Sequence, residues 1–179
     1  MRAWATGARS QSSDGRESCG PRSSGVGAEG LERIGQLSER EFLVLGLALC
    51  AGEGGKTNGE VGFANSDPRM ILVFVTWLRH FFEIDETRLR TRLYLHARLD
   101  LDAAIDFWSV LAAIPPSQFA KPYRAVADHS IRRNRHVFGC PGLSYGCTTT
   151  HRRVMGMIEA VLSPTCLSGV AQLAVARDC

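Results

Sequence analysis

The sequence predicts an α+β domain, with a mainly antiparallel sheet and helices stacked on one of its faces. The expected helices and strands are joined by connections short enough for hairpins. One central strand alternates polar and apolar residues with period two, which buries one face of a sheet and leaves the other open. At 179 residues, 45% of them hydrophobic, the chain has the size and composition of one globular domain.

The first expected element is a helix over residues 39–51. Ser38 and Glu41 stand at the spacing of a capping box, in which each side chain bonds to the other residue's backbone amide. The residues from Phe42 to Ala51 are apolar on every side, which places this helix in a core or an interface. A run of glycines that begins at Gly52 ends it.

Two strands and a helix follow. Residues 60–65 alternate as a strand, and Asp67 with Pro68 begins a helix that extends to Glu83. Residues 88–96 form the clearest strand of the chain. One face of this strand is expected to carry Arg88, Arg90, Arg92, Tyr94 and His96, and the other Leu89, Thr91, Leu93 and Leu95.

The C-terminal half is expected to add two helices and a hairpin. Asp100 caps a helix that extends to about Ala113, and residues 117–131 are interpreted as irregular. Short strands over 133–138 and 143–147 flank a turn at Pro141-Gly142. The last helix covers residues 149–162.

Both ends of the chain are expected to lie outside the domain, which covers residues 37–163. Residues 1–36 are rich in glycine and serine and lack periodic apolar residues, so we expect them to be disordered. Residues 164–179 are expected to be an unstructured tail. Within it, Ser168–Leu173 resembles the peptide encoded by the start of a transfer-RNA gene, and we interpret the tail as read-through.

One segment of the chain carries a local excess of positive charge. The net charge is +3, yet residues 121–153 hold seven Lys and Arg against the single carboxylate of Asp128. Guanidinium groups suit phosphates and guanine edges, so we expect double-stranded DNA as the partner, with a solvated face as the alternative. The expected DNA-binding residues are Lys56, Arg88, Arg90, Arg92, Tyr94, Lys121, Arg124, Arg132, Arg133 and Arg135.

Several classes of protein are excluded by composition and spacing. No apolar run reaches the 18 or so residues of a membrane span, and the N-terminus has no apolar stretch of signal-peptide length. The six cysteines are scattered, which favours a reducing cytoplasm over a disulfide framework. With DNA as the expected partner, the expected location is cytoplasmic and nucleoid-associated. Cys50 stands where a P-loop ending in Gly55-Lys56-Thr57 needs its first glycine, so no nucleotide cofactor is expected.

One set of cysteines and histidines contains the ligand types of a structural zinc site. It consists of His136, Cys140, Cys147 and His151. Its spacing is not that of a standard zinc motif, and a cysteine in a strand is commonly a small apolar residue. We therefore do not expect zinc.

The segment Leu47-Ala-Leu-Cys-Ala-Gly-Glu-Gly54 is similar to the motif of the LAGLIDADG homing endonucleases. The resemblance extends over roughly residues 38–162 and is closest to single-motif bacterial proteins. It is carried by Phe63–Pro68, Tyr94–His96, Asp100–Asp102, Phe107–Trp108, Lys121–Arg124 and His151–Arg153. The helix-turn-helix segment that often precedes this part in the family is not evident here. The resemblance implies a LAGLIDADG-like fold in which an apolar helix packs against its twin.

For this chain the resemblance implies a homodimer and one acidic site. The small residues Gly46, Ala48, Ala51 and Gly52 would let a second helix approach closely. Glu53 occupies the acidic position that holds Mg²⁺ in the family, where a carboxylate suits a hard cation, whereas Ala51 replaces the earlier acid. The primary hypothesis is a sequence-specific DNA-binding protein acting as a transcriptional regulator. The alternatives are a Mg²⁺-dependent endonuclease that uses Glu53 from each subunit, and a non-functional remnant.

Overall fold

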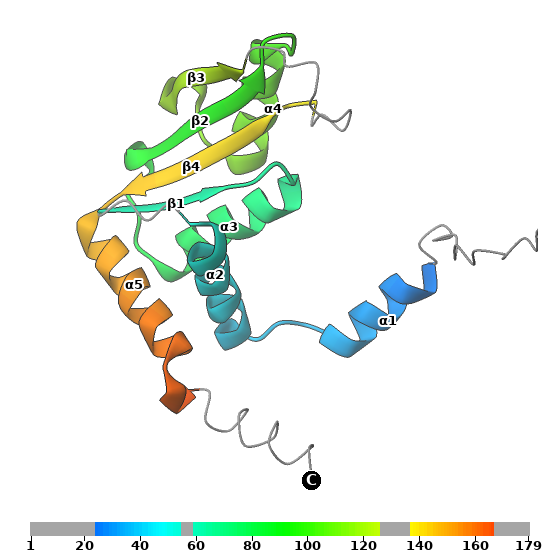
Figure 1. Ribbon diagram of the computed structural model, residues 1–179, viewed down its shortest axis with the longest axis vertical. Helices are drawn as coiled ribbons and strands as arrows, with labels where there is room; N and C mark the ends of the chain where they lie inside the picture. The colour runs from blue at the N-terminus through cyan, green and yellow to red at the C-terminus, as the bar shows by residue number, and fades with distance from the viewer. Residues whose placement is uncertain (1–23, 55–58, 126–136, 167–179) are drawn as a thin grey trace, which may run out of the picture. The chain divides into compact units, whose positions relative to one another are not determined.

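The computed structural model describes residues 24–54, 59–125 and 137–166 (Figure 1). The chain divides into two units, residues 1–37 and residues 38–179. In the first unit, helix α1 (Ser24–Ile34) ends at Gly35, which has the left-handed φ of 63° typical of a helix stop. The expectation of disorder is corrected for this stretch, because the strong helix formers Ala28, Glu29 and Leu31 outweigh the glycines between them.

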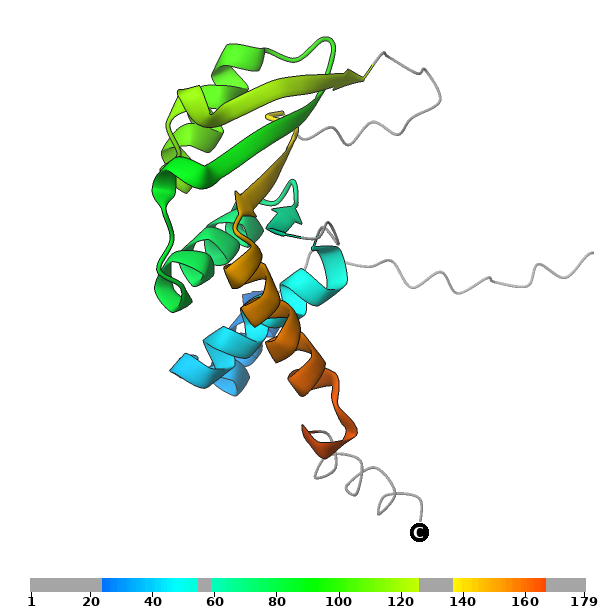
Figure 2. The same cartoon turned by 90° about the vertical axis from the view of Figure 1, so that its left-hand side faces the viewer.

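A four-stranded sheet forms the centre of the second unit, in the order β1-β4-β2-β3 (Figures 1 and 2). Its strands are β1 (Glu60–Ala64), β2 (Leu89–His96), β3 (Phe119–Ala125) and β4 (Cys140–Gly146). β4 pairs antiparallel with both β1 and β2, whereas β3 pairs parallel with β2. The prediction of an α+β fold with a mainly antiparallel sheet is therefore confirmed.

The described helices of this unit are α2 (Glu39–Glu53), α3 (Pro68–Phe81), α4 (Leu101–Ala112) and α5 (Thr148–Leu162). The first three begin where the sequence places their caps. Ser38 and Glu41 form the expected capping box of α2. The side chain of Asp67 accepts from the Arg69 amide at the start of α3, and Asp100 accepts from the first amides of α4. These local bonds satisfy amide groups that a helix start leaves free.

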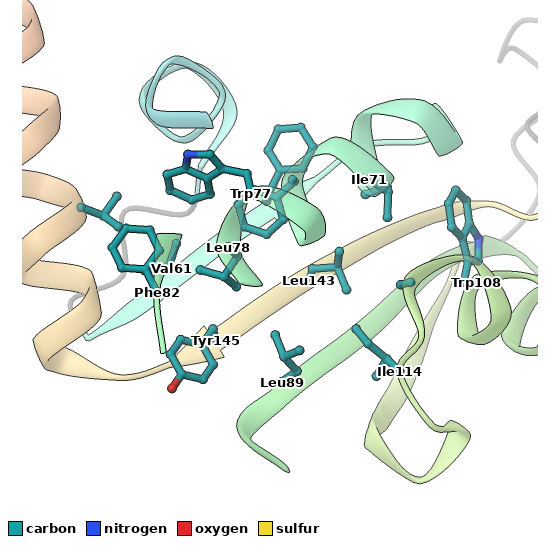
Figure 3. Packing of buried hydrophobic residues seen from close by; sticks show 14 of the residues in the cluster. Val61, Ile71, Trp77, Leu78, Phe82, Leu89, Trp108, Ile114, Leu143 and Tyr145 are labelled. Atoms are coloured by element: carbon teal, nitrogen blue, oxygen red, sulfur yellow. The ribbon is translucent and has the colours of Figure 1, made fainter. Parts of the chain in front are cut away.

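One face of the sheet and the helices share a single apolar core (Figure 3). The inward positions of the strands include Val61, Leu89, Leu143 and Tyr145, all at most 3% exposed. They pack with side chains from each of the four helices of this unit, and Trp77 of α3 is fully buried. Since burial alternates along β1, β2 and β4, the opposite face of the sheet remains open.

The third and fourth strands differ from the prediction. Residues 119–125, expected to be irregular, form the edge strand β3 beside β2. Their sequence Phe-Ala-Lys-Pro-Tyr-Arg-Ala lacks strict alternation, and Pro122 is tolerated because an edge strand has one unpaired side. The strand is therefore specified by its neighbour β2 rather than by its own pattern.

The hairpin expected around Pro141-Gly142 is also wrong, because both residues lie inside β4. The Pro141 carbonyl accepts from the Asn65 amide, just beyond the end of β1. The N–H and C=O of one residue point to the same side of a strand, so the N–H that Pro141 lacks would point toward Asn65 and not toward β2. The proline therefore removes no hydrogen bond between β4 and β2. Most of the strand expected over 133–138 lies outside the described residues.

Candidate nucleic-acid interface

The open face of the sheet carries two of the three arginines that the sequence places on it. Arg90, Arg92 and Tyr94 of β2 are exposed, while Thr91, Leu93 and their odd-numbered neighbours are buried. The alternation predicted for this strand is therefore confirmed from residue 89 onward.

Register defines what lies beside the two arginines. Arg90 pairs with Ser144, which pairs with Gly62, and Arg92 pairs with Gly142, which pairs with Ala64. Each arginine thus stands beside two small residues on the same face, because directly paired residues share a face. The result is a row of two long cationic side chains next to a nearly bare floor. The guanidinium of Arg90 also donates to the Thr87 and Leu89 carbonyls, which holds it at the start of β2.

This floor is hollowed into a cavity of about 530 Å³. Arg90, Arg92 and Tyr94 line it on the β2 side, and Glu53 and Glu60 line it on the side of β1 and α2. The face is therefore electrically divided, with guanidinium groups along β2 and carboxylates along the opposite wall. A polyanion on this face would be attracted to the β2 side.

Two tyrosines stand together on the open face. Tyr94 and Tyr123 are paired between β2 and β3, and their ring centroids lie 6.0 Å apart. The rings are 47% and 61% exposed, respectively. Sequence analysis did not predict a functional role for Tyr123. Only the register between β3 and β2 shows that Tyr123 lies beside Tyr94. The exposed Lys121 belongs to the same edge strand.

Two predicted DNA-binding arginines are directed elsewhere. Arg88 belongs to a 3₁₀ turn (Glu86–Arg88) before β2, and its guanidinium lies over the ring of Tyr145, 5.9 Å from the centroid. Tyr145 is only 2% exposed and belongs to the covered face. Alternation ends where the strand ends, so Arg88 does not continue the row of Arg90 and Arg92.

Arg124 is the second of these arginines. Its register partner Leu95 faces the core, so Arg124 projects to the side opposite Tyr123. Its guanidinium donates to the Ala97 carbonyl at 2.6 Å, which fixes the chain just beyond β2. Arg124 is therefore not part of the row of Arg90 and Arg92 on the open face. The remaining predicted cations, Lys56, Arg132, Arg133 and Arg135, lie outside the described residues.

The cysteines of the candidate zinc set are not brought together. Cys140 begins β4 and Cys147 follows its end, so the extended strand separates them by roughly 20 Å, at about 3.4 Å per residue. Both thiols cannot bind one ion with Zn–S bonds of about 2.3 Å. His136 lies outside the described residues, and no group of three metal-ligating side chains occurs among those that are described.

Glu53 lies at the border of the hollow, as the last residue of α2. Its Oε2 accepts from Nδ2 of Asn65 at 3.2 Å. The Asn65 Oδ1 accepts in turn from the Asp67 amide at 2.9 Å, which sets the orientation of the carboxamide. The carboxylate is thus directed by a neighbour and still exposed, an arrangement in which it could hold a hydrated divalent cation.

The four small residues expected at a dimer interface divide into two groups. Gly46 is buried, and a Cβ there would lie 2.2 Å from atoms of the Trp77 indole. It therefore serves the core of its own chain, and its assignment to an interface is corrected. Ala48 and Gly52 are exposed and Ala51 is half-buried. The exposed apolar strip of α2 consists of Val44, Leu45, Ala48 and Gly52.

Comparison with known proteins adds no family to this description. No protein-family model matches the chain, and neither does any curated protein. In the part of the chain that the structure describes, every helix is too short or too polar to cross a membrane.

Proposed function

We propose that the chain is a sequence-specific DNA-binding protein that places the open face of its sheet along the major groove. The observation that carries this proposal is the row of Arg90 and Arg92 beside a floor of small residues. Strands can enter the major groove of B-DNA, and an arginine can pair with both acceptors of a guanine edge. The bare floor lets the bases approach the backbone of β4 without a clash.

The division of charge favours one orientation of the DNA. Phosphates would lie on the side of β2 and β3, where Arg90 and Arg92 are exposed, and away from Glu53 and Glu60. Like charges repel most strongly at close range in a site from which water is excluded. In the proposed complex, β2 and β3 therefore contact phosphates and guanines. The wall that carries Glu53 and Glu60 faces the base edges and not the phosphates.

We also propose a homodimer in the manner of a LAGLIDADG-like fold, with the exposed apolar strip of α2 as the contact. Val44 and Leu45 are each 36% exposed, and the small side chains of Ala48 and Gly52 would allow helix backbones to approach closely. Introducing a charge by Ala48→Glu is expected to shift the protein toward monomers in sedimentation velocity. Monomers alone in the unmodified protein at micromolar concentration would contradict this part of the proposal.

The test of DNA binding uses the dependence of affinity on salt. Each phosphate contact that is lost lowers the slope of log K against log salt by about 0.9. Arg90→Ala and Arg92→Ala should each weaken the binding of duplex DNA in an anisotropy titration and flatten this slope if they contact phosphates. Arg40→Ala is the matched control, because Arg40 lies near the other end of α2, about 20 Å along the helix from Glu53.

The outcome of these titrations is decisive in either direction. Unchanged affinity and slope in both β2 variants would reject the open face as the DNA site. Enrichment of a common motif from a pool of random duplexes would establish specificity for sequence. A folded protein that binds no duplex would favour the remnant.

The second candidate function is Mg²⁺-dependent cleavage of DNA, and it is favoured by the position of Glu53. Its carboxylate stands at the border of the hollow and is oriented by Asn65. A metal ion held there could polarise a phosphoryl oxygen and activate water. Supercoiled plasmid incubated with Mg²⁺ should be nicked by the unmodified protein and by Glu83→Gln, but not by Glu53→Gln. Cutting that persists in Glu53→Gln would remove Glu53 from the reaction, and no cutting at all favours the regulator.

A further inference from the structure

Exposed aromatic rings are concentrated on the open face of the sheet. Among the described residues, Tyr94 and Tyr123 are the aromatic side chains that belong to the large exposed hydrophobic set. The remaining exposed members of that set are aliphatic side chains on helices and connecting segments. Aromatic rings that add nothing to a core are a feature of surfaces that bind a planar or apolar partner.

The two rings are held side by side rather than stacked on each other. They belong to directly paired residues of neighbouring strands, and their planes are inclined by 46°. Tyr94 also extends over β4, since its Cε2 lies 3.3 Å from the position that a Cβ of Gly142 would take. The glycine therefore makes room for the ring, and β4 supports it from beneath. Its outer surface remains available to a partner.

Cations follow the aromatic rings along the same strand. Arg92 and Arg90 are two and four residues from Tyr94, so they stand on the same face at intervals of about 7 Å. The carboxylates of Glu53 and Glu60 line the opposite wall. Planar rings followed by regularly spaced cations match a chain that alternates bases with phosphates.

Whether the bound DNA is paired or unpaired depends on which part of a base the two tyrosines can contact. In a duplex the flat surfaces of the bases are covered by their neighbours, and only their edges are open in the grooves. A base that has left the stack exposes its whole π-surface, and aromatic side chains bind it there. A tyrosine whose outer surface is free gains much more contact from an unpaired base than from a paired one.

We infer that Tyr94 and Tyr123 form a stacking platform for unpaired bases, so that the open face prefers DNA containing a short single-stranded stretch. Arg90 and Arg92 hold the phosphates that flank the stacked bases. This inference rests on the proposed binding of DNA by the open face, and it adds the structural state of the DNA that binds best.

The test compares three fluorescently labelled DNAs of equal length, namely a duplex, the same duplex with a central mismatched bubble, and the single strand. The unmodified protein should bind the bubble at least about fivefold more tightly than the duplex, which is the smallest effect expected from one stacked base. Tyr94→Leu and Tyr123→Leu should each bring the affinities for bubble and duplex to within about twofold of each other. Tyr94→Phe and Tyr123→Phe keep the ring and should keep the preference.

Exposure of both side chains makes these variants compatible with folding, and unchanged urea midpoints should verify it. Equal affinity of the unmodified protein for duplex and bubble would overturn the inference while leaving the proposed function intact. A loss of the same size on duplex and bubble in the leucine variants would overturn it too, since the tyrosines would then contact paired DNA. Failure to bind any of the three DNAs would refute the proposed function itself.

Discussion

Gly46 and Gly52 lie in the same helix, and the substitution of alanine at each should change stability in opposite directions. A Cβ at Gly46 would stand 2.2 Å from the Trp77 ring, whereas nothing lies within 4 Å of a Cβ at Gly52. Carbon atoms approach each other to about 3.5–4.0 Å, so Gly46→Ala forces the indole to move by more than ~1 Å. Trp77 is fully buried between Phe74 and Phe82, which leaves little room for this movement.

The size of the effect follows from what Trp77 loses. Overpacking a core costs about 1–3 kcal/mol. The Trp77 Nε1 donates to the Leu43 carbonyl at 3.1 Å, and a buried donor without its acceptor costs about 1–3 kcal/mol more. Alanine returns up to about 1 kcal/mol through its higher helix propensity. We therefore expect Gly46→Ala to lower the free energy of unfolding by about 3 kcal/mol, or Tm by about 6–12 °C.

The assay is urea unfolding followed by tryptophan fluorescence, together with thermal unfolding followed by circular dichroism. Gly52→Ala is the control and should raise stability by about 0.5 kcal/mol or more, because it gains helix propensity without a clash. Gly52 belongs to the exposed apolar strip, so both variants are measured at a concentration where sedimentation shows monomers. A urea midpoint for Gly46→Ala at or above that of the unmodified protein would refute the packing argument.

Further predictions concern an ion pair and thiol reactivity. Arg79 bonds to both carboxylate oxygens of Glu86 at 2.8 Å and to the Ala112 carbonyl, so Arg79→Ala should cost about 2 kcal/mol in urea unfolding at pH 7. The hydrogen bond from Arg79 lowers the pKa of Glu86 below its usual value of 4.5. The stability contributed by the ion pair is therefore complete above that usual value and is lost as the pH falls through the lowered pKa. The difference between the two proteins should accordingly shrink on acidification, and a constant difference would contradict it. Hydrogen bonds from Thr150 lower the pKa of the Cys147 thiol, while burial raises that of Cys50 to about 12, so iodoacetamide at pH 8 should label Cys147 before Cys50 by peptide mass mapping. Faster labelling of Cys50 would oppose this assignment.

Some structural features could be predicted from the sequence because they depend on residues that are close together in the chain. The capping box of Ser38, the Asp67 cap and the Asp100 cap use side chains that reach amides two or three residues away. The alternation of β2 specifies which side chains face the same way, whatever lies beside the strand. Arg90, Arg92 and Tyr94 were therefore placed together on an open face by sequence reasoning alone.

The site depends on pairings that no local pattern contains. Tyr123 joins Tyr94 only through the parallel register of β3 with β2, and Gly142 lies beneath Tyr94 only because β4 runs between β1 and β2. Arg124 belongs to β3 as well, but its side chain points away from the open face because its register partner Leu95 faces the core. Its guanidinium donates to the Ala97 carbonyl instead. Sequence reasoning gave these residues their charge and ring chemistry without their neighbours.

The sequence by itself determined the class of fold, the starts of the helices and the cationic face of β2, since each of these follows from periodicity or from a contact within one turn. Only the tertiary structure decided the order of the strands, the burial of Gly46 against Trp77 and the meeting of Tyr94 with Tyr123. These contacts join residues tens of positions apart. Their choice depends on how the whole core packs, and a one-dimensional pattern does not encode which distant partner completes that packing best.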